Sequence, residues 1–250
     1  MLSAKRVGAV GEDAVVTQDP RFEQPLYALP EAARLVRVPA PTLRNWVSGY
    51  HYPRSVGVGT AAPVIRTPGS TGGLSFVNLV EALALAGFRE MRVPMQRVRR
   101  ALDYANAELE IDHLLASERL LSDGLDLFWE FQELSTGEPH LVNMSRRGQK
   151  AFPEAIMRYL RQIEWGDDRF ASRWWPVGNE QGHGVIVVDP SRAFGAPVVA
   201  ATGVRVEDLF GRFSAGESMA DLADDYGLRL DQVEAAIRLE ASLLEGRPAA

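Results

Sequence analysis

Residues 28–46 read Ala28-Leu-Pro-Glu-Ala-Ala-Arg-Leu-Val-Arg-Val-Pro-Ala-Pro-Thr-Leu-Arg-Asn-Trp46. Two short stripes of apolar residues, each with helical spacing, flank a break that contains two prolines. The first helix is expected to begin at Pro30, where the missing N–H of proline costs nothing. The second is expected over residues 42–47, with Leu43 and Trp46 turned toward the first. This stretch therefore predicts a helix-turn-helix.

The segment that follows the second helix is rich in Gly, Pro, Ser and Thr. Strand-like pieces around Val56 and over residues 63–66 predict a β-hairpin, the wing of a winged helix-turn-helix. Ser75 is a good N-cap for a third helix over residues 76–91. A fourth helix is expected over residues 94–109, so the basic unit continues to about residue 110.

The charge of the chain is unevenly distributed. Eleven Lys and Arg residues but four Asp and Glu residues lie between Arg21 and Arg100, a net charge of +7 in a chain whose total is −6. A compact basic domain that holds a short helix against a polyanion is typical of DNA-binding proteins. A helical hairpin with solvated arginines is the alternative. It does not explain why the basic excess, the wing and a polar outer helix face coincide.

Side chains of the second helix that face outward are suited to base edges, and arginines around it are suited to phosphates. Arg97, Arg99 and Arg100 on the fourth helix can extend this basic face. DNA contacts are expected from seven residues: Arg34, Arg37, Thr42, Arg44, Asn45, Arg54 and Arg66.

The whole chain is expected to be α+β and mainly helical. A flexible tail is expected over residues 1–22 and the winged helix-turn-helix over 23–110. A mixed α/β connecting region is expected over 111–183, and a C-terminal module of a short β-segment and a three-helix unit over 184–250. The connecting region is predicted to hold a hairpin (120–129), a strand (140–144), a helix (151–163) and a loop (166–184).

The C-terminal module is expected to contain strands at 185–189 and 197–200 and helices at 205–213, 218–226 and 230–244. Its net charge of −5 argues against a second DNA-reading helix and favours a packed helical dimerisation module. Its apolar positions exceed what a small unit buries easily, which predicts a symmetric homodimer: Leu209, Phe210, Phe213, Met219, Leu222, Val233, Ile237 and Leu244.

Residues 28–46 resemble the winged helix-turn-helix of MerR-type regulators. Arg37 stands where that family usually has a turn glycine. The chain also lacks the long dimerising helix and the cysteine metal site that many MerR proteins carry.

The run Asp189-Pro-Ser-Arg-Ala-Phe-Gly-Ala-Pro-Val-Val-Ala200 and the helices after it resemble small antitoxin domains of unknown function, often paired with PIN-like ribonuclease toxins. Together with the MerR-like start and the linking piece at residues 143–152, the chain resembles the long VapB-type antitoxins of actinobacteria over about residues 25–245. The resemblance implies a cytoplasmic operon autorepressor whose partners are operator DNA, a PIN-like toxin and a second copy of itself. A MerR-like one-component regulator that senses a small molecule, and a purely structural dimer, remain alternatives.

Other kinds of site have little support in the sequence. His51, His113, His140 and His183 are scattered, and the chain has no cysteine, so no metal site or cofactor is expected. No set of nucleophile, base and orienting group is recognisable, which argues against an enzyme. No apolar run is long enough to span a membrane. Trp174-Trp175 is expected to form a buried aromatic clamp, and Asp167-Asp168 to be solvated.

Overall fold

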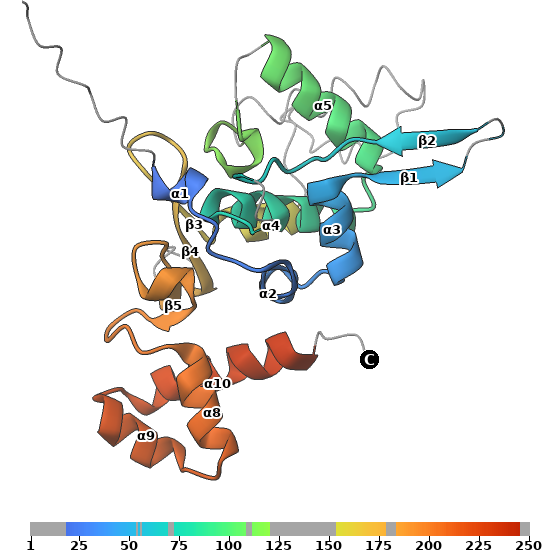
Figure 1. Cartoon of the computed structure of the whole chain (residues 1–250). Helices are drawn as coiled ribbons and strands as arrows, with labels where there is room; N and C mark the ends of the chain where they lie inside the picture. The colour runs from blue at the N-terminus through green and yellow to red at the C-terminus, as the bar shows by residue number, and fades with distance from the viewer. Residues whose placement is uncertain are drawn as a thin grey trace, which may run out of the picture.

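The computed structural model describes residues 19–53, 55, 57–69, 73–108, 112–120, 154–178 and 184–245. Its elements confirm the expected α+β, mainly helical class (Figure 1). In chain order they are α1 (Pro20–Glu23), α2 (Leu29–Leu35), α3 (Ala40–Ser48), β1 (Tyr50–Pro53), β2 (Val58–Ala61), α4 (Phe76–Glu90), α5 (Met95–Glu108), η1 (Leu114–Ala116), α7 (Glu154–Leu160), β3 (Ile163–Trp165), β4 (Ala171–Gly178), β5 (Gly184–Val188), η3 (Ala193–Gly195), β6 (Val198–Val199), α8 (Val206–Ser214), α9 (Met219–Tyr226) and α10 (Leu230–Glu245).

The predicted helix-turn-helix is formed by α2 and α3, which pack against each other. Leu35 of α2 and Leu43 and Trp46 of α3 are buried, as the apolar spacing predicted. Arg37 lies in the turn with a φ of 56°, a left-handed conformation that costs a non-glycine residue about 1–2 kcal/mol. The arginine at the usual glycine position therefore adopts the backbone conformation that favours glycine.

A β-hairpin follows α3 directly, formed by antiparallel pairing of β1 with β2. Gly49 joins α3 to this hairpin at a φ of 70°, and a Cβ at Gly49 would lie 2.3 Å from the carbonyl oxygen of Ala61. The hairpin begins earlier than predicted, and residues 63–66 are not a strand. The backbone N–H groups of Val64 and Ile65 instead donate to the carbonyl oxygen of Trp46, at 2.7 and 3.0 Å, so this piece follows the end of α3.

Helix α4 lies at the centre of the N-terminal half, in contact with α1, α7, η1 and β4 (Figure 1). Its predicted N-cap is confirmed. The Ser75 hydroxyl accepts from the Asn78 N–H at 3.2 Å, and the Asn78 side chain accepts from the Ser75 N–H at 3.3 Å, a reciprocal capping box. Residues 76–88 are all buried, so α4 is a core helix.

Four antiparallel strands form one sheet in the order β3-β4-β5-β6. The expectation of a loop over residues 166–184 is wrong, because β4 occupies residues 171–178. Trp174 and Trp175 point to opposite faces of this strand and are both buried, Trp174 in the main core and Trp175 with Val187 and Val198. Because β4 is covered on both faces at this point, its sequence lacks the alternation that identifies a half-buried strand.

Two further expectations for the connecting region differ from the structure. The helix expected over 151–163 ends at Leu160 in α7, since Ile163 already belongs to β3. The boundary expected at residue 184 falls between β4 and β5, which pair in the sheet. The predicted hairpin at 120–129, beyond Leu120, and the predicted strand at 140–144 lie outside the described residues.

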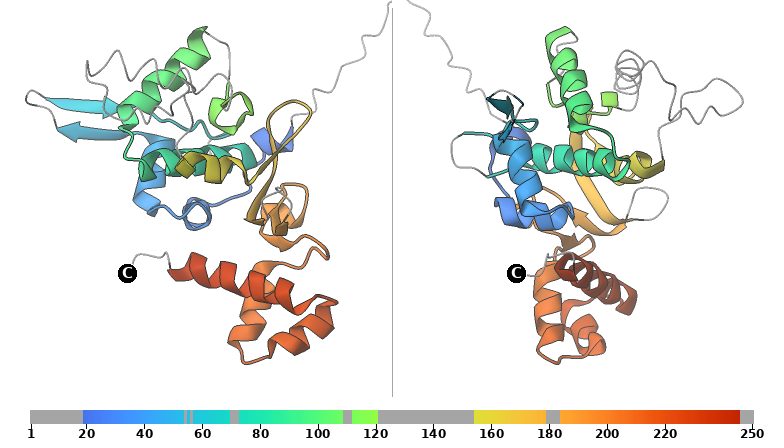
Figure 2. Two further views of the ribbon diagram at one scale, coloured as in Figure 1. Left: turned by 180° about the vertical axis from the view of Figure 1, so that it is seen from behind. Right: turned by 90° about the vertical axis from the view of Figure 1, so that its right-hand side faces the viewer.

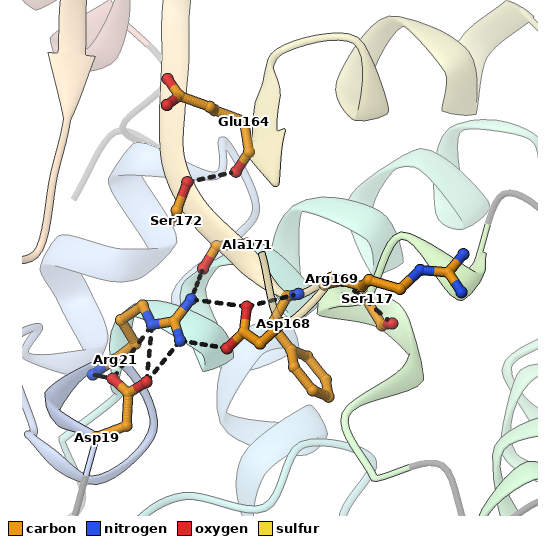
Figure 3. A network of polar contacts seen from close by, with 9 residues as sticks. Asp19, Arg21, Ser117, Glu164, Asp168, Arg169, Ala171 and Ser172 are labelled. Atoms are coloured by element: carbon orange, nitrogen blue, oxygen red, sulfur yellow. Dashed lines mark hydrogen bonds and ion pairs between the residues drawn. The ribbon is translucent and has the colours of Figure 1, made fainter. Parts of the chain in front are cut away.

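Helix α1 lies in the segment expected to be a flexible tail. Its Arg21 forms ion pairs with Asp19 and with Asp168, and it also donates to the carbonyl oxygen of Ala171 at 3.4 Å (Figure 3). The hydrogen bond from Arg21 holds the pKa of Asp168 below its usual range. Asp168, expected to be simply solvated, therefore helps to fix α1 against the turn between β3 and β4.

The three C-terminal helices, α8, α9 and α10, closely match the residue ranges predicted for them. The Ser218 hydroxyl caps α9 by accepting from the Asp221 N–H at 3.1 Å, and Gly227 ends α9 in a left-handed conformation. Helix α10 packs against α8, α9 and β5 and also reaches α2, beneath which it runs (Figures 1 and 2).

The apolar positions from which a homodimer was inferred are largely covered within the same chain. Leu209, Leu222, Val233 and Ile237 are buried, and the other four are half-buried. Less apolar area is exposed than predicted, because α10 rests on β5 and α2 as well as on the other two helices. No helix in the described part of the chain is both long enough and apolar enough to cross a membrane.

Candidate nucleic-acid interface

Helix α3 presents a polar outer face. Arg44 and Asn45 are exposed and Thr42 is half-buried, while Leu43 and Trp46 hold the helix to the core. No hydrogen bond or ion pair ties the Arg44 guanidinium to another described residue. The three residues expected to read DNA thus lie together on one short helix, and the arginine among them is free to meet an anion.

The two arginines near the end of α2 are placed differently. Arg34 forms an ion pair with Glu240 of α10, and the exposed fractions of the two side chains are 19% and 6%. The Arg37 guanidinium, which remains exposed, donates to the Ser242 hydroxyl at 2.9 Å. This arrangement argues against the expected phosphate contact by Arg34, because a buried carboxylate already neutralises its charge. No local sequence pattern indicated that α10 would reach α2.

The hairpin brings further polar and aromatic groups next to α3. The rings of Tyr50 and Tyr52 lie 6.0 Å apart, and Nδ1 of His51 is 3.0 Å from the Thr60 hydroxyl. Arg66, after the hairpin, is 75% exposed and lies 4.0 Å from Asp112. Arg54, the other arginine expected to contact DNA from the wing, lies outside the described residues.

A hollow of about 270 Å³ lies between α4, α5, η1 and the segment that follows the hairpin. Arg66, Glu81, Arg99, Asp112 and His113 are among the residues that line it. Both terminal nitrogens of Arg99 are buried and have no hydrogen-bond partner among the described residues, and the guanidinium lies 6.0 Å from the centre of the Tyr50 ring. A buried guanidinium without a partner is unusual, because each unmet donor is costly.

Glu81 and His113 form the other polar feature of this hollow. Nδ1 of His113 lies 3.0 Å from the carboxylate of Glu81, which also accepts from the Asn78 amide at 3.0 Å. Burial lowers the pKa of His113, but the hydrogen bond and the charge of Glu81 outweigh this effect, so the pKa is raised.

The pair of Glu81 and His113 was not predicted from the sequence. The signal was Glu81 itself, a carboxylate inside the otherwise apolar helix α4. Among the described residues, no group of three His, Asp or Glu side chains is placed to hold a metal.

Two segments match known families. Residues 25–102 match a family described as "Putative DNA-binding HTH domain", and residues 186–239 match "Protein of unknown function (DUF433)". Over 228 residues the chain is 38% identical to "Putative antitoxin VapB45" of Mycobacterium tuberculosis, an alignment that covers 87% of this chain and 94% of that protein. The chain belongs to the family of that antitoxin. This confirms the expected order of a helix-turn-helix followed by a small domain of unknown function.

Two further comparisons lead to the same organism. "Uncharacterized protein Rv2308" is 31% identical over 224 residues, which cover 86% of this chain and 90% of that protein. The crystal structure of Rv2018 superposes with a TM-score of 0.67 at 36% identity and covers 87% of this chain and 99% of that one. The likeness therefore extends across both halves of the molecule.

Proposed function

We propose that this chain is a non-catalytic antitoxin that binds its own operator DNA and neutralises a PIN-like ribonuclease toxin. Membership of an antitoxin family and the match to a DNA-binding domain support the general role. The outer face of α3, with Thr42, Arg44 and Asn45, is the single observation that carries the DNA-binding half of the proposal.

In the proposed complex α3 enters the major groove in the manner of MerR-type regulators, and the hairpin acts as a wing. Arginine pairs with guanine O6 and N7, asparagine with adenine, and threonine with a phosphate or a thymine methyl. Arg37 and Arg66, which precede and follow α3 in the sequence, supply phosphate contacts, whereas Arg34 has a structural role in holding α10. Autorepression follows if the operator overlaps the promoter of the chain's own operon.

We also propose that the chain binds DNA as a homodimer. A symmetric dimer would place two copies of α3 on half-sites about 34 Å apart, one helical turn of DNA. The area available for such a contact is smaller than the sequence suggested, because the chain itself buries half of the C-terminal apolar positions and partly covers the rest.

A titration of promoter DNA at several salt concentrations tests the DNA-binding half. Arg44→Ala is expected to weaken specific binding by about 1–3 kcal/mol and to relax specificity at the base that Arg44 contacts, whereas Arg66→Ala is expected to reduce the slope of log K against log salt by about 1. Arg238→Ala is the matched control, since Arg238 is an exposed arginine on α10 paired with Glu234. The proposal is wrong if Arg44→Ala binds the promoter with wild-type affinity and wild-type sequence specificity. Co-expression with the toxin gene tests the other half: growth arrest despite co-expression would contradict it.

The hollow between α4, α5 and η1 favours a second candidate, a regulator that senses a small molecule. The unpaired nitrogens of Arg99 are suited to a small phosphate or carboxylate, and the position beside Tyr50 would transmit occupancy to the hairpin. A thermal-shift and promoter-binding series with inorganic phosphate and citrate, using Arg99→Gln as the control, tests it. If neither anion changes melting temperature or promoter affinity at millimolar concentration, this candidate fails.

A further inference from the structure

The turn between β5 and β6 has an unusual backbone. Ala193, Phe194 and Gly195 follow one another with φ angles of 47°, 55° and 77°, all in the left-handed region. Glycine adopts this region readily, but alanine and phenylalanine do so at a cost. Such strain persists only where the surrounding structure enforces it, and it is common at functional sites.

Several side chains hold this turn in place. The carboxylate of Asp189, itself 5% exposed, accepts from the Ser191 N–H at 2.9 Å and from the Ser191 hydroxyl at 2.6 Å. Nε of Arg173 donates to the same carboxylate at 2.9 Å, which ties the start of the turn to β4. The Arg192 guanidinium donates to the carbonyl oxygen of Ala200 at 3.3 Å across the turn. The turn is therefore fixed before any partner arrives.

The N-terminal half of the chain fixes the far side of the turn. The hydroxyl of Tyr27, a buried residue just before α2, donates to the carbonyl oxygen of Gly195 at 3.0 Å. A Cβ at Gly195 would lie 2.3 Å from that hydroxyl, so glycine is needed for the close approach. The two halves of the molecule thus cooperate to set the position of residue 194.

Phe194 makes no evident contribution to the core that would justify this strain. Its side chain is 82% exposed, the most of any large apolar side chain among the described residues. A turn of this shape favours asparagine or glycine, and an exposed phenyl ring is poorly solvated. Large aromatic side chains held rigidly at the surface are typical anchors of protein–protein interfaces.

We propose that Phe194 is the anchor through which this chain docks onto its toxin, with the phenyl ring inserted into an apolar recess on that protein. This inference rests on the proposed antitoxin function. Phe194 lies in the 186–239 segment, and the module from residue 184 onward carries a net charge of −5, which complements a ribonuclease with a basic surface. Figure 1 places β5, which precedes the turn, at the opposite side of the molecule from the β1–β2 hairpin, so operator DNA would not block this contact.

The affinity of the full-length chain for the ribonuclease encoded by the neighbouring reading frame tests the proposal. Phe194→Ala and Phe194→Asn are expected to weaken binding at least tenfold, and Phe194→Tyr, which keeps the ring, to stay within about threefold of wild type. Leu230→Ala is the matched control, because Leu230 is an exposed apolar residue at the start of α10, and it should bind as wild type does. Phe194→Asn should melt no lower than wild type, since asparagine tolerates the left-handed region better.

The experiment separates the two levels of the argument. If wild type does not bind the ribonuclease, the proposed function itself is wrong. If wild type binds and Phe194→Ala binds within twofold of it, this inference alone is overturned. The inference is also overturned if Phe194→Ala dissociates a homodimer while toxin affinity is unchanged, since the ring then contacts a second copy. Tyr27→Phe keeps the aromatic ring but removes the hydrogen bond to Gly195 that fixes the turn. Its affinity for the ribonuclease is expected to lie between those of wild type and Phe194→Ala.

Discussion

Replacement of Glu240 by alanine is expected to lower the free energy of unfolding by about 2–4 kcal/mol. Removal of one partner from a buried ion pair costs about 3–5 kcal/mol, mainly because the other charge is left buried and unpaired. Arg34 retains 19% exposure, so water can partly replace the lost carboxylate and the expected value lies toward the low end. By contrast, an exposed pair such as Arg238 with Glu234 is worth about 0–1 kcal/mol.

Urea unfolding of a double-mutant cycle measures this coupling. The single variants Glu240→Ala and Arg34→Ala should each be destabilised, and the double variant should be less so than the sum, with a coupling energy above about 1 kcal/mol. The pair Arg34→Met with Glu240→Leu should lie near wild type, because apolar replacement of a buried pair is often neutral. A loss below 1 kcal/mol in Glu240→Ala, or additive single variants, would refute the view that α10 is fixed to α2 by this contact.

Three further predictions concern other parts of the fold. Glu81 raises the pKa of His113 in the folded chain, so this pair stabilises the fold fully below pH about 6.5, and the stabilisation is lost as pH rises through the raised pKa. The difference in unfolding free energy between wild type and His113→Asn should therefore shrink between pH 5.5 and 8.5. A difference that stays constant over this range would contradict the pairing. Gly195→Ala should cost more than about 2 kcal/mol in thermal unfolding, whereas Gly227→Ala, with a φ of 61° and open space around its Cβ, should cost only the left-handed strain of about 1–2 kcal/mol; equal losses would mean that Tyr27 is not in close contact with Gly195. Ser75→Ala should lose about 1 kcal/mol through the α4 cap, and a neutral result in urea unfolding would count against the capping box.

Much of the local structure was predictable because it depends on neighbouring residues. The spacing of Leu43 and Trp46, the cap at Ser75 and the turn at Gly227 are all local signals, and the structure confirms them. Strand β4 was missed since Trp174 and Trp175 are buried on opposite faces, which removes the alternation that marks a strand. The hairpin strands were misplaced because Val64 and Ile65 bond to the end of α3 instead of to a strand.

The candidate site was predictable in part for the same reason. The outward position of Arg44 and Asn45 follows from the buried residues beside them. The partner of Arg34 is 206 residues away in the sequence, and no local pattern indicates such a contact. The turn that presents Phe194 is likewise held by a hydrogen bond from Tyr27 to Gly195, two residues that lie 168 positions apart in the sequence.

The four-stranded sheet has a consequence for how genes of this kind can recombine. The segment that matches a family of its own, residues 186–239, contains β6 and most of β5 but neither β3 nor β4. If a gene fusion moved this segment alone into another protein, β5 would lose its partner β4. The strand that carries Ile186 and Val188 would then have an unpaired edge, which promotes aggregation. Each new host would have to supply a strand in place of β4, so shuffling should favour exchanges that begin upstream of residue 163.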